Sequence, residues 1–79
     1  MPRYFFHVHE TEGIVEDEDG VDFPDLGAAR ADALEAAREI MATYVRKGLD
    51  VSHWSFEIAD GSRWPVMAVP FSEAVRRAA

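Results

Sequence analysis

One segment, residues 24–48, is long and periodic enough to form a helix of several turns, and it constrains the fold more than any other feature. At about 100° per residue its apolar side chains fall on one stripe and its charged ones on the opposite side. The stripe consists of Leu26, Ala29, Ala33, Ala37, Ile40 and Tyr44, flanked by Leu34, Met41 and Val45. This pattern is typical of an amphipathic helix lying on a surface. Its central alanines bring the helix close to a flat partner, most simply a β-sheet.

Both ends of the predicted helix are marked by residues that favour helix termini. Asp25, directly after Pro24, is a residue type that caps free backbone N–H groups. Arg46 and Lys47 suit the negative end of the helix dipole, and Gly48 supplies the left-handed residue that commonly follows a helix.

Alternating apolar residues on either side of the helix predict an antiparallel sheet. The predicted strands are residues 3–9 and 14–17 before the helix, and residues 54–59 and 64–71 after it. Asp60-Gly61 is a favoured hairpin turn between the last two. Because Pro65 and Pro70 cannot donate to a strand ladder, at least the ends of the fourth strand belong at a sheet edge or outside the pairing.

The expected fold is therefore α+β, with an antiparallel sheet of three or four strands in β-β-α-β-β order. One long helix packs on one face, and a short helical turn follows Ser72. The side chains expected beneath the helix are Tyr4, Phe6, Val8, Trp54, Phe56 and Ile58. At 79 residues the chain, residues 1–79, forms a single domain with a thin core.

The charge balance and the missing residue types exclude several function classes. The formal net charge is −7, so the chain repels phosphate backbones and is not expected to bind nucleic acid. It contains no cysteine, and its serines form no recognisable catalytic motif. No apolar run is long enough for a signal peptide or a membrane span, so we expect a cytoplasmic protein with no membrane association.

His7 and His9 are the strongest candidates for chemistry. Two residues apart on a strand, they project from the same face about 7 Å apart, close enough to share a metal ion. The local sequence holds no further ligand, although His53 or Glu57 would supply one if the third strand lies beside the first. A structural role on the less buried face of the sheet is the alternative. We therefore assign no catalytic residue, metal ligand or cofactor, and keep a metal-binding or hydrolytic site at this pair as the second hypothesis.

The acidic segment 17–22 superficially resembles the start of a calcium loop. If Gly20 takes the glycine position of such a loop, Val15 and Leu26 occupy the first and twelfth positions, where oxygen ligands are required. The segment is better explained as a solvated turn whose carboxylates keep the adjoining strand edge from pairing with other chains.

Three sequence motifs identify a resemblance. MPRYFFH opens the chain, GVDFPDL precedes alanines repeated at every fourth position, and VPF lies near the end. Over nearly the whole chain these motifs resemble a family of small bacterial proteins, the domain of unknown function 6894. The resemblance implies a free-standing bacterial domain in the cytoplasm, and it carries no activity, ligand or catalytic residue.

Apolar residues on the sheet face away from the helix favour a protein-interaction or regulatory module. One helix covers only one face of a sheet, and both sets of alternating residues in the fourth strand are apolar. The predicted contact residues are Phe5, Trp64, Met67 and Val69. We expect a homodimer formed through the sheet or, failing that, a heterologous protein partner. An antitoxin-like partner protein is a third possibility, by analogy with other small sheet-plus-helix bacterial domains.

Overall fold

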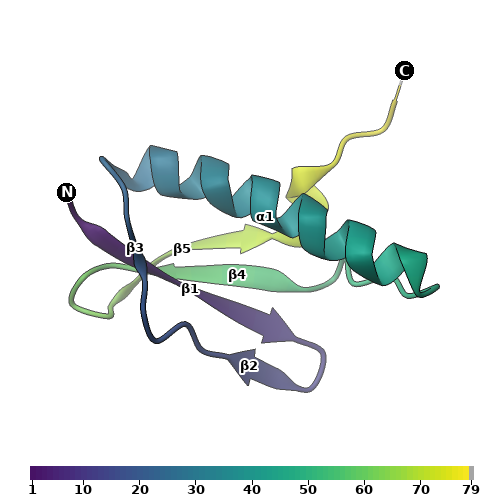
Figure 1. The fold of residues 1–79 in the computed structure, drawn as a ribbon, viewed down its shortest axis with the longest axis horizontal. Helices are drawn as coiled ribbons and strands as arrows, with labels where there is room; N and C mark the ends of the chain where they lie inside the picture. Colours follow the sequence, from purple (N-terminus) through teal and green to yellow (C-terminus); the bar gives the residue numbers. More distant parts are fainter. Residues whose placement is uncertain (79) are drawn as a thin grey trace.

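The computed structural model describes residues 1–78 and shows one long helix lying across one face of an antiparallel sheet (Figure 1). In chain order its elements are β1 (Arg3–Glu10), β2 (Gly13–Val15), β3 (Val21–Asp22), α1 (Leu26–Arg46), β4 (Ser55–Ala59), β5 (Pro65–Pro70) and a 3₁₀ turn, η1 (Phe71–Ala74). The predicted α+β fold is confirmed. The short strand β3 is an addition, because the sequence predicted a solvated turn over residues 17–22.

Strand β1 organises the sheet, because it pairs with β2, β3 and β4. The strand order is β2-β1-β4-β5, and β3 pairs with β1 further along the edge that β2 occupies. Val8 of β1 lies opposite Val15 of β2, whereas Tyr4 lies opposite Val21 of β3. The middle of this β1 edge, residues 5–7, therefore lies between the part that pairs with β3 and the part that pairs with β2. At the other side of the sheet β5 is an edge strand, as its two prolines predicted.

Helix α1 packs through the predicted alanine stripe. Ala29, Ala33 and Ala37 are fully buried, and their small side chains bring the helix close to the sheet. The Asp25 carboxylate accepts a hydrogen bond from the Ala28 N–H at 2.8 Å, which caps the helix as expected. Of the flanking residues, Val45 does not join the core, because it lies at the last turn and stays 65% exposed.

The chain is thin, because it has only two layers. Its extents are 37 × 31 × 16 Å, and α1 runs over the β5 side of the sheet. The six side chains expected beneath the helix all belong to the core or pack against it. Within residues 1–78, no helix has the length and apolarity that a membrane span requires.

Two local expectations need correction. The second strand ends at Val15, since the following residues turn back toward β1 instead of continuing the ladder. In the β4–β5 hairpin the left-handed residue is Arg63, with φ 62°, and Gly61 does not have a positive φ. The Arg63 N–H bonds to the Asp60 carbonyl and the Asp60 N–H to the Trp64 carbonyl, so the loop is longer than a two-residue turn.

Candidate functional site on the outer sheet face

The sheet face opposite α1 is named the outer face here. Paired residues of antiparallel strands project to the same side, so the registers of β1, β4 and β5 define its members. They are Phe5, His7, His9, Ser55, Glu57, Ala59, Pro65, Ala68 and Pro70, with Ile14 of β2 beside His9. Its centre is polar, because His7 lies directly opposite Glu57.

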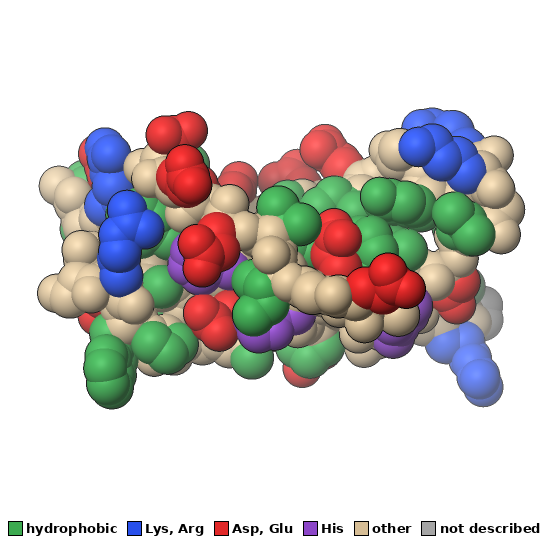
Figure 2. Space-filling view, turned by 90° about the horizontal axis from the view of Figure 1, so that it is seen from below, with side chains coloured by type: hydrophobic (Ala, Val, Ile, Leu, Met, Phe, Trp, Pro, Cys, Tyr) green, Lys and Arg blue, Asp and Glu red, His purple; other side chains and the backbone are tan. Residues whose placement is uncertain are grey.

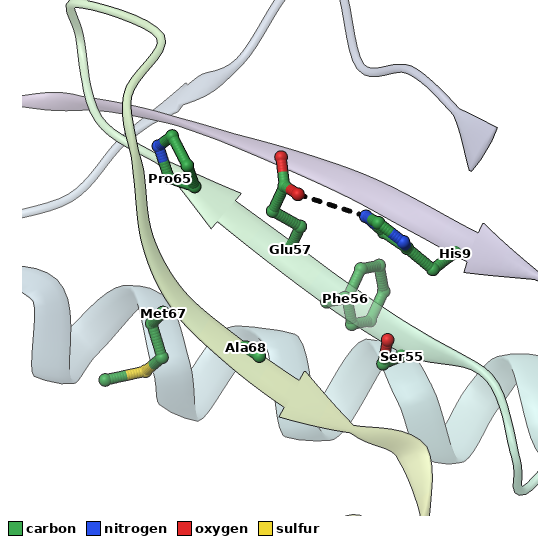
Figure 3. A pocket seen from close by; sticks show the side chains of 7 residues that line it. All are labelled: His9, Ser55, Phe56, Glu57, Pro65, Met67 and Ala68. Carbon is green, nitrogen blue, oxygen red and sulfur yellow. Dashed lines mark hydrogen bonds and ion pairs between the residues drawn. The ribbon is translucent and has the colours of Figure 1, made fainter.

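A carboxylate–imidazole pair borders a shallow hollow on this face. His9 Nε2 lies 3.1 Å from Glu57 Oε1, with both side chains more than one third exposed (Figure 3). The hollow has a volume of about 400 Å³ and is named the outer hollow. Its lining comprises His9, Ser55, Phe56, Glu57, Pro65, Met67 and Ala68. Such a pair can bind a polar group or pass a proton to one.

His7 is held by the backbone of the acidic segment. Its Nδ1 accepts a hydrogen bond from the Asp17 N–H at 3.0 Å. A nitrogen that accepts carries no proton, so a neutral His7 ring holds its proton on Nε2. His7 and His9 do share a face, as predicted, but they serve different partners. Within residues 1–78, no three His, Asp or Glu side chains are close enough to hold a metal ion together.

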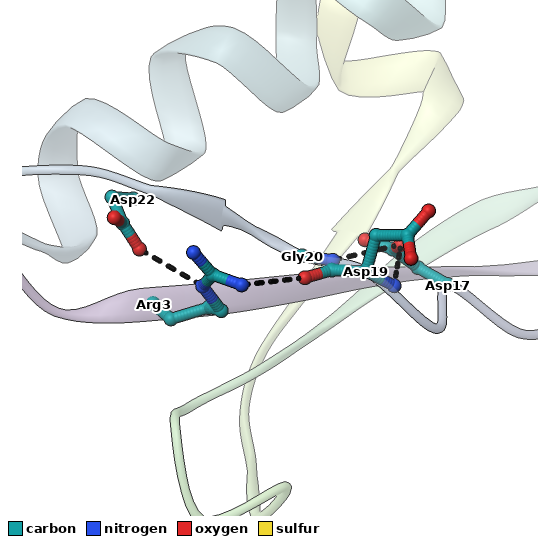
Figure 4. A network of polar contacts seen from close by, with 5 residues as sticks. All are labelled: Arg3, Asp17, Asp19, Gly20 and Asp22. Carbon is teal, nitrogen blue, oxygen red and sulfur yellow. Dashed lines mark hydrogen bonds and ion pairs between the residues drawn. The ribbon is translucent and has the colours of Figure 1, made fainter.

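The Asp17 carboxylate fills the gap between β2 and β3 on the β1 edge. Its Oδ2 accepts from the Phe6 N–H at 3.0 Å, and its Oδ1 accepts from the N–H groups of Asp19 and Gly20, both at 3.1 Å (Figure 4). A side chain thus replaces the missing strand as partner for β1. Partial burial pushes the Asp17 pKa upward, but these three hydrogen bonds outweigh it and hold the pKa below its ordinary value.

Arg3 ties the end of the same segment to β1. Its Nε donates to Asp22 Oδ1 at 3.0 Å, and its Nη1 donates to the Asp19 carbonyl at 3.2 Å (Figure 4). The hydrogen bond from Arg3 holds the pKa of the Asp22 carboxyl below its ordinary value. Two of the acidic side chains are therefore engaged in holding the turn, which gives the segment a structural role beyond solvation.

The predicted contact residues divide into two groups. Trp64 is 71% exposed, whereas Phe5 lies on the outer face but is only 6% exposed, because the Arg63 guanidinium covers its ring at 4.3 Å from the centroid. Met67 and Val69 pair with core residues of β4 and face α1. The prediction was wrong for Met67 and Val69, since the exposed apolar residues of β5 are Pro65, Val66 and Ala68. Sequence alternation separated the two sets but did not say which one faces the helix.

Sequence reasoning missed Arg63. It did place Glu57 near the two histidines on the condition that the third strand lies beside the first, and in the structure β4 pairs with β1. Arg63 was not singled out because the Asp60-Gly61 signal placed the left-handed residue too early. In the structure Asp60 Oδ1 accepts from the N–H groups of Ser62 and Trp64. Aspartate commonly bonds to backbone N–H groups a few residues further on, so its presence in the sequence was a usable signal for a longer turn.

The fold and this face define the protein as a small α+β domain whose one long helix covers only one face of the sheet. A family model described as Domain of unknown function (DUF6894) matches residues 3–72 of the 79. The chain belongs to this family, and the match spans the whole sheet and helix α1. No curated protein and no solved structure matches the chain.

Proposed function

We propose that this domain is a cytoplasmic protein-interaction module with a regulatory role, and that it acts as a homodimer formed through its outer face. The observation that carries the proposal is the exposure of Trp64 beside that face, at 71%, with Val66 next to it on the edge strand at 40%. Large aromatic side chains left in water are characteristic of contact surfaces.

The size of the chain supports the same proposal. A small domain buries a low fraction of its surface, so a symmetric partner adds apolar burial that a two-layer core cannot provide. A stable interface takes roughly 800 Å² from each partner, which is about 15% of the 5448 Å² surface of this chain. The sheet extends along the two longer dimensions of the chain, 37 and 31 Å, so its outer face offers an area of this order.

The distribution of charge indicates which part of the surface two copies can share. In the view of Figure 2, acidic side chains lie between hydrophobic and histidine side chains over much of the surface, and Lys and Arg lie toward the ends. By contrast, residues 64–72, which include all of β5, contain no charged side chain. Two chains of net charge −7 repel least where such a stretch meets its copy.

Light scattering coupled to gel filtration tests the proposal. At micromolar concentration we expect wild type to have twice the 8.9 kDa chain mass. Ala68→Glu, on the outer face, should be monomeric, whereas the matched change Ala42→Glu, at an exposed position of α1, should remain dimeric. A wild type that is monomeric throughout the concentration range would contradict the homodimer and leave the face to a heterologous partner, including an antitoxin-like role.

One observation favours the second candidate, a metal-binding or hydrolytic site. The His9–Glu57 pair lies at the rim of the outer hollow, where a ligand has access to it. Zinc titration by calorimetry tests this candidate. Stoichiometric binding that is lost in His9→Ala would support it, and absence of binding would reject the metal site.

A further inference from the structure

We infer that the dimer forms by reciprocal insertion, with Trp64 of each copy occupying the outer hollow of the other. This inference rests on the proposed function and names the contact through which self-association would occur. Both halves of the contact, the projecting side chain and the hollow, are present on one chain.

Trp64 stands apart from every other aromatic side chain in the described part of the chain. The other Phe, Tyr and Trp residues are buried or half-buried, whereas Trp64 is 71% exposed. Its backbone is well anchored, because the backbone N–H of Trp64 donates to Asp60 Oδ1 at 3.0 Å and its carbonyl accepts from the Asp60 N–H. An indole has few side-chain torsions to fix on binding, which is one reason why Trp is enriched among the residues that dominate interface energies.

The outer hollow is suited to an indole. Its volume of about 400 Å³ falls in the range of small-ligand sites. The small side chains of Ser55 and Ala68 leave room for a ring, and Pro65 adds an apolar border. Glu57 Oε1 is paired with His9, but Glu57 Oε2 makes no hydrogen bond within residues 1–78. The indole Nε1–H of the incoming Trp64 supplies a donor for that oxygen.

The arrangement of the two halves favours a second copy as the occupant. Pro65 borders the hollow and directly follows Trp64, so the projecting ring is attached one residue away from the border of the hollow. A two-fold axis passing between them lets both copies make the same contact, as an isologous interface requires. Arg63 directly precedes Trp64 in the chain, and Glu57 lines the hollow, so the two halves of the contact carry opposite charges.

The position of the acidic segment agrees with this geometry. Residues 17–22 lie along the β1 edge that carries β2 and β3, at the opposite side of the sheet from β5. An interface centred near β5 therefore keeps the two acidic edges far apart. Like charges separated by more than about 8 Å at physiological ionic strength are largely screened.

Two complementary variants test the inference. Trp64→Ala removes the projecting ring and leaves the hollow open, whereas Ala68→Trp fills the hollow and leaves the ring in place. Each alone should weaken dimerisation at least about 30-fold, the factor expected for loss of a dominant interface tryptophan. Mixing the two should give a heterodimer that is tighter than either variant's homodimer but weaker than wild type, since only one of the two insertions is regained. Val45→Ala, which shortens an exposed apolar side chain at the end of α1, is the control and should dimerise like wild type.

Sedimentation velocity of each variant and of the mixture, with folding checked by circular dichroism, gives the readout. A wild-type dimer whose affinity is unchanged by Trp64→Ala would overturn the insertion while leaving the proposed homodimer intact. A monomeric wild type would instead refute the proposed function itself. Failure of the mixture to form a heterodimer would also count against reciprocal insertion.

Discussion

The close approach of β1 to Gly20 makes this glycine the most informative position for testing the acidic turn. Its φ is +71°, and a Cβ added there would lie 2.9 Å from the Tyr4 carbonyl oxygen, 2.9 Å from Arg3 Cγ and 3.0 Å from a Phe5 ring carbon. The Tyr4 carbonyl belongs to the paired β1 backbone, so it cannot move aside without disturbing the ladder with β3. Gly20→Ala therefore combines an unfavourable backbone conformation with a steric clash.

Gly48→Ala is the matched control. Gly48 also has a positive φ, +80°, but no atom lies within 4 Å of the added Cβ. The left-handed conformation costs about 1 to 2 kcal/mol in either variant, offset by about 0.4 to 1 kcal/mol from the stiffer unfolded chain. The clash at Gly20 adds about 1 to 3 kcal/mol, as overpacking does elsewhere.

Urea denaturation followed by circular dichroism measures both effects. We expect Gly48→Ala to lower the free energy of unfolding by about 1 kcal/mol and Gly20→Ala by about 2 to 4 kcal/mol. Equal losses in the two variants would refute the reasoning, because they would mean that β1 does not approach Gly20 closely.

Three further predictions concern the helix, the acidic turn and the charge. Ala33→Leu should cost about 1 to 3 kcal/mol by overpacking the buried stripe, whereas Ala42→Leu should be nearly silent; equal thermal melts would reject the helix face. Asp17→Asn should cost about 1 to 2 kcal/mol in urea melts at neutral pH, because an amide NH₂ meets a backbone donor, and Glu18→Gln should cost nothing. Since the folded-state pKa of Asp17 is lowered, its contribution is present above pH ~4 and is lost as pH falls through the folded pKa, so wild type and Asp17→Asn should converge in acid. Oligonucleotide binding at physiological salt should be undetectable by fluorescence anisotropy, and tight binding would contradict the charge argument.

Local signals account for what the sequence predicted well. Helix α1 is specified by contiguous residues, since the cap at Asp25, the alanine stripe and the stop at Gly48 are each visible within a few positions. The edge position of β5 followed in the same way from its two prolines, which act through the missing backbone donor alone.

Long-range pairing accounts for what the sequence left open. Which set of β5 side chains faces α1 depends on the register with β4, and both sets are apolar, so composition gave no preference between Val66 and Val69. The role of Asp17 depends on hydrogen bonds to β1 residues ten and eleven positions earlier, which no local pattern reveals. The outer hollow likewise exists only once β1, β4 and β5 lie side by side.

A concentration series of ¹H–¹⁵N correlation spectra tests the outer-face interface most directly. The account predicts that, as concentration rises, signals of Ser55, Glu57, Ala68 and the Trp64 indole shift together along one binding curve. Signals of Asp32 and Glu35, on the exposed side of α1, should stay fixed. Two results would contradict it. One is a set of spectra that do not change with concentration, together with a molecular tumbling time typical of a monomer. The other is a set of shifts confined to the exposed side of α1.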